Sequence, residues 1–449
     1  MKRTHKKRLL GATLVLLVGA MQPAQAQTSE ALLEVLVRKG ILTEQEAEDI
    51  KVELALENQK FNNVKAPGKT TQLIELSGDF RGRFEGFYAD HDDWTDRNRW
   101  RYRLRVGLTA ALTDRFKVGV RLASGEESGT FGSDPISRNA TMQNNGSGKF
   151  IFIDQAYANF VALTNIDYTS SVTFGKMANP FEFSALVFDD DYTPEGVANP
   201  MNYIINEEHN LAFTMAAFFL DEIGGDSDDP YLLAAQLRHN GIWRYNEAHK
   251  PKLDSTIGLA GMAIANDQSL GNGAVPNINV GNSRNAAGNL TATFNPIVVD
   301  GALTYWLDSA PQYNGFFPIS IIGTYMNNLA ESSENVGYEV GVKLGKAGKK
   351  ATWEVGYNYR FLEADAWYEE LVDSDFGSYY AATPASFGQA GAGYRSGTNN
   401  KGHIVKVAYS PYNALTLSLK GIFTTLIDEP AGQADSDMLR VQADAVVKF

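Results

Sequence analysis

Four arginines at alternate positions are the residues whose type and spacing most clearly suggest chemistry. Trp100, Tyr102 and Leu104 fill the positions between them. Because successive side chains of an extended chain point to opposite faces, a strand here would carry one aromatic face and one strongly cationic face. A guanidinium group stays charged at any accessible pH, so a column of such groups attracts anions. The members of this arginine ladder are Arg99, Arg101, Arg103 and Arg105.

The sequence also contains acidic side chains that could neutralise the arginine ladder. If they pair with the arginines across a barrel wall, the ladder is structural. If they do not, it lines a cationic pore, and the sequence alone leaves both interpretations open. The candidate partners are Asp79, Glu85, Glu339 and Glu354.

Residues 76–88 repeat the same alternation just upstream. Their even positions are apolar or glycine, and nearly all their odd positions are polar. Both segments exceed the roughly 9–11 residues that a tilted strand needs to cross a bilayer. A membrane barrel, with lipid outside and water inside, explains such strands better than a long hairpin of a soluble β-domain does. The side chains predicted to line its pore are Arg81, Arg83, Arg99, Arg101, Arg103, Arg105, Lys117 and Arg121.

An acidic segment is the second candidate for a functional site. It could fold into the pore as a constriction that faces the arginines and gives a transverse electric field. It could equally be a calcium-binding or solvated loop. Its acidic residues are Asp189, Asp190, Asp191 and Glu195.

The start of the chain predicts export. Residues 1–26 combine a basic beginning, an apolar run over 9–20 and an Ala24-Gln25-Ala26 cleavage site, as in a secretory signal peptide. Removing its five lysines and arginines changes the formal charge from −13 to −18, which argues against a nucleic-acid partner. The absence of cysteine excludes disulfides and thiolate metal sites, and we predict no metal and no cofactor.

Residues 27–61 are the one region with helical patterning. Apolar residues recur at helical spacing, and Thr43 with Glu46 forms a capping box. The narrow apolar stripe predicts self-association as a periplasmic coiled coil, with a homotrimer as the expected assembly. A small helical plug or an amphipathic leader is the alternative. Residues 62–71, with Pro67-Gly68, are the expected linker.

From residue 72 to 449 the pattern predicts one strand after another. Short turns alternate with long polar loops, which is typical of an up-and-down barrel. The legible segments indicate about sixteen antiparallel strands, although residues 196–310 alternate poorly. The last strand alternates as well and ends at Phe449. An aromatic carboxyl-terminal residue resembles the signal by which bacterial outer-membrane barrels are assembled. The predicted fold is therefore an all-β transmembrane barrel in the outer membrane.

Several motifs, in order along the chain, resemble the bacterial outer-membrane family usually labelled "putative porin". The resemblance implies a barrel, a trimer and a water-filled channel for passive diffusion of small hydrophilic solutes. Phosphate-selective porins are similar more distantly, but their residues have no alignable counterparts here, so no phosphate site is implied. The motifs span residues 175–181, 187–191, 194–196, 323–328, 353–366, 373–377 and 397–403.

Two other functions compete with a channel. A barrel enzyme of the omptin type would need acid–base residues at the rim, and His91-Asp92-Asp93 lies in the first long loop. No second Asp/His group is recognisable, so an enzyme is not expected. A structural tether would need residues 27–61 to bind the cell wall, but this segment lacks an aromatic sugar-binding surface.

Overall fold

The computed structural model describes most of the chain beyond residue 72. The predicted signal peptide (1–26), helical segment (27–61) and linker (62–71) lie outside the described residues. The described ranges are 73–126, 136–225, 227–246, 250–270, 280–381, 392–430, 432–433 and 435–449.

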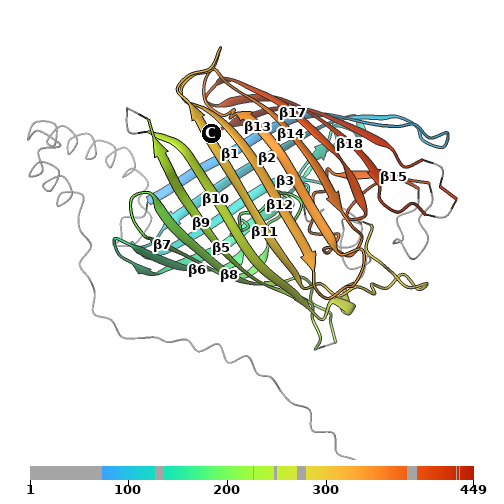
Figure 1. The fold of residues 1–449 in the computed structure, drawn as a ribbon. Coiled ribbons are helices and arrows are strands. Elements are labelled where there is room, and N and C mark those ends of the chain that lie inside the picture. Colours follow the sequence, from blue (N-terminus) through green and yellow to red (C-terminus); the bar gives the residue numbers. More distant parts are fainter. Residues whose placement is uncertain are drawn as a thin grey trace, which may run out of the picture. The chain divides into compact units, whose positions relative to one another are not determined.

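Within these ranges, seventeen strands form one antiparallel sheet and two more form a separate hairpin (Figure 1). One of the seventeen, β4, is a two-residue strand beside β2, and the other sixteen close the barrel. The long strands are β1 (Leu73–Ala89), β2 (Arg97–Ala111), β3 (Phe116–Gly125), β5 (Phe150–Thr164), β6 (Tyr168–Lys176), β7 (Glu195–Ile204), β8 (His209–Phe219), β9 (Tyr231–Tyr245), β10 (Pro251–Ala265), β11 (Pro296–Leu307), β12 (Phe317–Asn328), β13 (Val336–Gly345), β14 (Thr352–Leu362), β17 (Asn400–Tyr412), β18 (Leu415–Leu426) and β19 (Met438–Lys448). The short elements are β4 (Ala140–Thr141), β15 (Gly377–Tyr380), β16 (Gly393–Ser396), and the 3-10 turns η2 (Asn144–Gly146) and η3 (Asp267–Ser269).

The barrel closes where its first strand meets its last. β1 pairs with β2 on one side and with β19 on the other, and the second ladder runs from Asp79 opposite Lys448 to Ala89 opposite Met438. The chain therefore winds once around the wall in sequence order, as an up-and-down barrel requires. The predicted fold is confirmed. No helix among the described residues is long and apolar enough to span a membrane.

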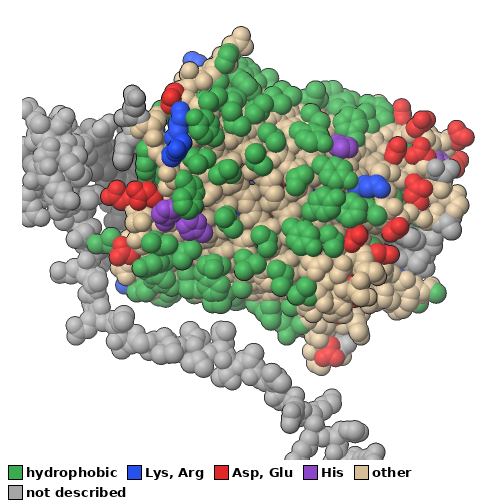
Figure 2. All heavy atoms as spheres, in the orientation of Figure 1, with side chains coloured by type: hydrophobic (Ala, Val, Ile, Leu, Met, Phe, Trp, Pro, Cys, Tyr) green, Lys and Arg blue, Asp and Glu red, His purple; other side chains and the backbone are tan. Residues whose placement is uncertain are grey.

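The two faces of the wall differ as the alternation predicts. On the outer face Leu76 is 64% exposed and Trp100 is 60% exposed, whereas Arg83 and Arg103 on the inner face are 5% exposed. Figure 2 shows hydrophobic side chains spread over the outer surface. Lipid covers such a surface in a membrane, while the inner charges stay away from hydrocarbon. The outward orientation predicted for the even positions of residues 76–88 and 100–112 is confirmed.

Part of the lumen holds a hydrophobic core. The loops at 177–194, 280–295 and 363–376 fold inward and bury apolar side chains against the inner wall. Trp367 is fully buried, and its Nε1 donates a hydrogen bond to the Val187 carbonyl oxygen at 3.0 Å. The wall residues that pack on these loops include Phe218, Leu232, Ala234, Met262, Ile264, Val298 and Met326. The larger cavity of the lumen is lined instead by β1, β2, β13, β14 and β17 to β19.

The inner core explains why residues 196–310 alternate poorly. In β8, Phe218 is fully buried on the inner face while Phe219, its neighbour, is 61% exposed on the outer face. Inward positions of β9 to β11 are likewise apolar because they pack on the loop core. Apolar side chains on both faces remove the period-two contrast that marks a half-buried strand.

Candidate functional site

The inner faces of β1 and β2 bring six arginines together. The register places Arg81 opposite Arg103 and Arg83 opposite Arg101, so both pairs share the lumen side of the wall. Like charges at directly opposite positions repel each other, so this arrangement requires nearby anions. The same register supplies two: Asp79 stands opposite Arg105, and Glu85 stands opposite Arg99.

Glu85 is the buried centre of one ion-pair network. Its carboxylate accepts a hydrogen bond from Arg99 Nε at 2.5 Å and a second, very short one from Arg440 of β19. Arg101 Nη1 lies 3.6 Å from the same carboxylate, and Arg83 Nη1 lies 3.9 Å away. The side chain of Glu85 is fully buried, so its single negative charge is shared among several cations.

Two further aspartates, Asp79 and Asp444, form ion pairs with arginines of β1 and β2. Asp79 accepts hydrogen bonds from Arg103 at 3.1 Å and from Arg105 at 2.7 Å. Asp444 of β19 receives a bidentate pair from Arg83, at 2.7 and 2.8 Å, which is the strong geometry for a guanidinium and a carboxylate. Ion pairs therefore join β1 to its neighbours on both sides.

The other two acids proposed as partners are also paired, but with different cations. Glu339 accepts a hydrogen bond from Arg360 Nε at 2.6 Å, and Glu354 lies 2.9 Å from Lys406 Nζ. The four candidate acids therefore all form ion pairs, two of them with the arginines of β1 and β2.

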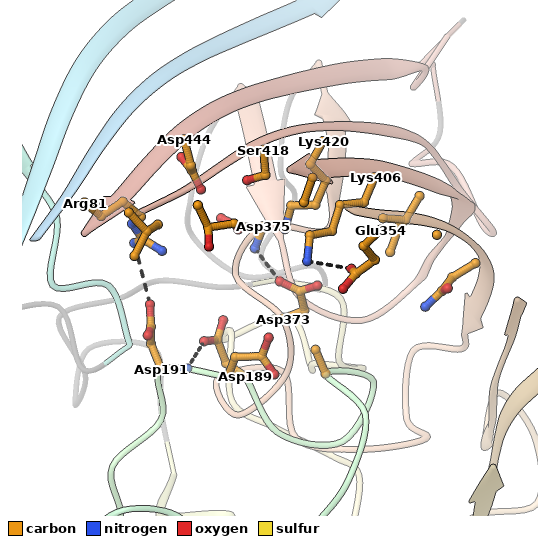
Figure 3. Close-up of a pocket in the computed structure, with 18 of the residues that line it drawn as sticks. Arg81, Asp189, Asp191, Glu354, Asp373, Asp375, Lys406, Ser418, Lys420 and Asp444 are labelled. Carbon is orange, nitrogen blue, oxygen red and sulfur yellow. Dashed lines mark hydrogen bonds and ion pairs between the residues drawn. The ribbon is translucent and has the colours of Figure 1, made fainter. Parts of the chain in front are cut away.

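The acidic segment at 189–191 reaches the arginine wall from the loop after β6. Asp191 accepts hydrogen bonds from Arg103 at 2.6 Å and Arg105 at 3.2 Å, and it lies 3.7 Å from Arg81 (Figure 3). Asp189 holds the loop in place by accepting backbone hydrogen bonds from Asp191 and Ser374, both at 2.8 Å. The loop thus contacts the inner wall here, and this contact is called the narrowing.

A second loop, after β14, meets the wall beside the first. Asp375 lies 2.7 Å from Arg440, 3.3 Å from Lys420 and 3.5 Å from Arg83. Asp373 accepts a hydrogen bond from Arg360 at 2.8 Å. The sequence marks Asp373-Ser-Asp375 as an acidic motif, yet nothing in it indicates that this motif lies next to residues 189–191.

Among the described residues, the remaining predicted ones form no ion pair with the aspartates at 189–191. Glu195 is exposed and pairs with Lys176 at 2.9 Å, so it does not join the aspartates of its loop at the wall. Arg121 pairs with Asp154, and it lines a small cavity together with residues 189–191. Lys117 is an exposed residue near the start of β3. Sequence reasoning missed several residues that the closed barrel brings to the narrowing, namely Arg360, Lys420, Arg440 and Asp444.

Two cavities adjoin the narrowing, of about 720 and 340 Å³, and residues 189–191 line both. Asp189 and Asp190 belong to the loop rather than to a membrane-spanning strand. Burial, followed by the charge of nearby Asp373, raises the pKa of both carboxyl groups. The larger cavity carries charges of both signs. Its cationic lining is Arg81, Arg83, Arg103, Arg105, Lys343, Arg360, Lys406, Lys420 and Lys448, and its acidic lining is Asp189, Asp190, Asp191, Glu339, Glu354, Asp373, Asp375 and Asp444.

A closed antiparallel barrel with an apolar exterior and a charged lumen, with loops folded inward, is the architecture of an outer-membrane channel. Residues 87–257 match the family described as "Putative porin", which confirms the resemblance read from the sequence. A search of curated proteins found no match.

Solved structures that are similar to this chain include proteins from three bacteria. OprB of Pseudomonas putida is 11% identical with a TM-score of 0.46, over 84% of this chain and 94% of that one. OmpF of Salmonella typhi, in complex with daunomycin, is 9% identical with a TM-score of 0.44, over 84% and 97%. The outer membrane channel DcaP of Acinetobacter baumannii is 13% identical with a TM-score of 0.42, over 86% and 100%.

Proposed function

We propose that this porin passes small hydrophilic solutes by passive diffusion and prefers small anions. The observation that carries the proposal is the contact between Asp191 and the arginine wall, which narrows the lumen to a passage lined by fixed charges. Selectivity in a channel depends on the few charges at its narrowest point. Charges on loops that face bulk solvent are screened over about 8 Å at physiological salt. The acidic net charge of the chain therefore does not determine the ion selectivity of the channel.

The balance of charge at the narrowing favours anions. Most wall arginines are matched by a carboxylate, but the lining also includes Lys343 and Lys448, which form no ion pair with any residue that the structure describes. On the acidic side, the raised pKa values of Asp189 and Asp190 keep these carboxyls protonated to higher pH than an ordinary aspartate. The cavity is therefore left with an excess of positive charge.

Arg81, on β1, is the wall arginine best placed to meet a solute. Its Nη2 donates a hydrogen bond to Asn139 Oδ1 at 2.8 Å, and the nearest carboxylate oxygen, on Asp191, is 3.7 Å away. Arg103, by contrast, is held by Asp79 and Asp191 together, so it has less capacity to bind a passing anion.

Planar-bilayer recording of the Arg81→Gln variant in a salt gradient tests this proposal. Glutamine retains a donor for Asn139 but removes the charge. The reversal potential should move toward cation preference, while Arg97→Gln, which removes an exposed charge at the end of β2, should leave it unchanged. If Arg81→Gln does not change the reversal potential, the wall arginines are structural, and the acidic loop becomes the better candidate for the selectivity filter.

We also propose that the channel is not an enzyme and assembles as a homotrimer. The ring centroids of His91 and Tyr379 lie 4.5 Å apart, and His91 Nδ1 accepts a hydrogen bond from the Asp93 backbone N–H at 3.1 Å. These contacts support a structural role rather than an acid–base role. Purified protein that cleaves neither peptides nor phospholipids would support the absence of enzymatic activity, whereas turnover that His91→Ala abolishes would refute it.

The trimeric assembly has its own test. Crosslinking of the protein to a trimer in mild detergent would support it.

A further inference from the structure

Two histidines lie side by side on the outer surface, away from the lumen. His209 begins β8, directly after a short turn, and His239 lies on β9. The register pairs His209 with Gly241 and His239 with Leu211, so the two histidines are diagonal neighbours on one face of the sheet. Figure 2 shows histidine side chains gathered on the outer surface near one end of the barrel.

The imidazole rings face each other at the separation of two metal ligands. His209 Nδ1 lies 3.2 Å from His239 Nε2, and the ring planes are inclined by 21°. Imidazole nitrogens bind Zn²⁺ at about 2.0–2.1 Å. When the N–Zn–N angle is tetrahedral or somewhat smaller, the two nitrogens lie roughly 3–3.4 Å from each other. The observed spacing therefore matches the bite of a single ion.

The surroundings of the pair keep this geometry. A Cβ on Gly241 would stand 2.7 Å from His209 Nδ1 and 2.9 Å from His239 Cε1, so a side chain at this position would force the rings to move from this arrangement. Trp243 packs edge-on against His209, with ring centroids 5.0 Å apart. The exposed tryptophan belongs to the aromatic residues that mark the edge of the apolar band on such barrels, where water reaches the surface.

We propose that His209 and His239 form a binding site for a divalent transition-metal ion, with Cu²⁺ bound more tightly than Zn²⁺ or Ni²⁺. Imidazole nitrogen suits these ions and not Ca²⁺ or Mg²⁺, and Cu²⁺ binds most tightly of the divalent first-row series. Water supplies the remaining coordination positions. The ion joins β8 to β9 at the rim of the barrel, and it binds only when both facing nitrogens carry no proton.

A hydrogen bond between the two rings is the competing explanation for the same distance. It requires a proton on one of the facing nitrogens, whereas a shared metal ion requires both to be bare. The two states exclude each other. A titration with metal therefore separates them.

The test uses the full-length protein in detergent, titrated with CuCl₂ while tryptophan fluorescence is recorded. Copper bound at the pair should quench Trp243, and the electron paramagnetic resonance spectrum should show coupling to two nitrogens. His209→Gln and His239→Gln should each weaken binding by at least about tenfold, because even changes outside the ligand set cost roughly 10–100-fold in metal affinity. Each variant should retain coupling to one nitrogen at most.

Two controls sharpen the result. His403 is another outer-surface histidine, but its Nδ1 faces the Tyr357 hydroxyl at 2.8 Å, so His403→Gln should bind copper as the wild type does. Gly241→Ala keeps both histidines yet places a methyl group between them, and it should weaken binding. Equal affinity in the wild type and the His209→Gln/His239→Gln double variant, or coupling to a single nitrogen in the wild type, would overturn the proposal.

Discussion

A single buried carboxylate, that of Glu85, allows arginines to crowd the inner wall. Ion pairs at an exposed surface contribute little to stability, but this carboxylate is fully buried and lies near four guanidinium groups. In such a place the loss of one partner leaves cations uncompensated. Glu85 therefore has a structural role and sets the spacing of the arginines that flank the narrowing.

Replacing Glu85 with glutamine should destabilise the barrel. Glutamine has nearly the same shape, so the effect measures the lost charge. Breaking a buried ion pair by removing one partner costs about 3–5 kcal/mol. We expect a clear fall in the urea midpoint of unfolding in detergent. Glu195→Gln, at an exposed carboxylate with one lysine partner, is the matched control and should change little. Equal midpoints for the two variants would contradict the role given to Glu85.

Ion selectivity should depend on pH through the loop carboxyls. The pKa values of Asp189 and Asp190 are raised by burial and then by Asp373, so both carboxyls remain neutral to higher pH than usual. Raising the pH ionises them and adds negative charge to the cavity, which should reduce anion preference. Lowering the pH should increase it. Reversal potentials recorded over a pH series measure the effect, and Asp189→Asn should flatten it. A wild-type response of the opposite sign would contradict the assignment.

At the scale of elements, the sequence predicts some strands better than others. Alternation identifies β1, β2, β13 and β14 because water and lipid contact opposite faces of each strand. It fails for β8 to β11, whose inner faces pack on the hydrophobic core inside the lumen. That core comes from loops distant in sequence, so no local pattern could reveal it. The one feature of the sequence that indicates this core is the apolar content of the loops themselves, as in Leu186-Val187-Phe188.

The site was harder to predict than the wall. Alternation places Arg83 on the lumen face, but its bidentate partner Asp444 lies 361 positions away and becomes its neighbour only when the barrel closes. Whether the wall arginines are free or neutralised depends on such pairs. Likewise, the chain has two acidic motifs on long loops, and only the folded loops show that Asp189 accepts a hydrogen bond from Ser374.

The loop core should hold the narrowing in place. Trp367 is fully buried among Phe188, Phe294 and wall residues. Truncating a buried tryptophan to alanine costs about 3–5 kcal/mol. Trp367→Ala should loosen both loops while the wall stays intact, so single-channel conductance should rise and fluctuate more. Trp100→Ala, on the lipid-facing surface, is the control. A steady wild-type conductance in Trp367→Ala would show that the ion pairs alone fix the loops.

The whole molecule depends on the seam between its first and last strands. Phe449, the final residue, accepts a hydrogen bond from the Gly78 backbone at 2.9 Å and donates one back at 3.1 Å. A Cβ at Gly78 would lie 2.5 Å from the Arg105 carbonyl oxygen and 2.5 Å from the Phe449 ring. A side chain at this position would therefore push against both β2 and the carboxyl terminus, on either side of β1.

Gly78→Val should accordingly weaken closure of the barrel. The backbone of β2 cannot yield as a side chain can, and overpacking of this kind costs about 1–3 kcal/mol. The matched control is Gly82→Val on the same face of β1, because a Cβ there has no heavy atom within 4 Å. We expect Gly78→Val to lose its compact, heat-modifiable gel mobility at a lower temperature than the wild type, and Gly82→Val to behave as the wild type does. If both valine variants lose the compact mobility at the same temperature, the destabilisation arises from placing valine in β1 rather than from the seam.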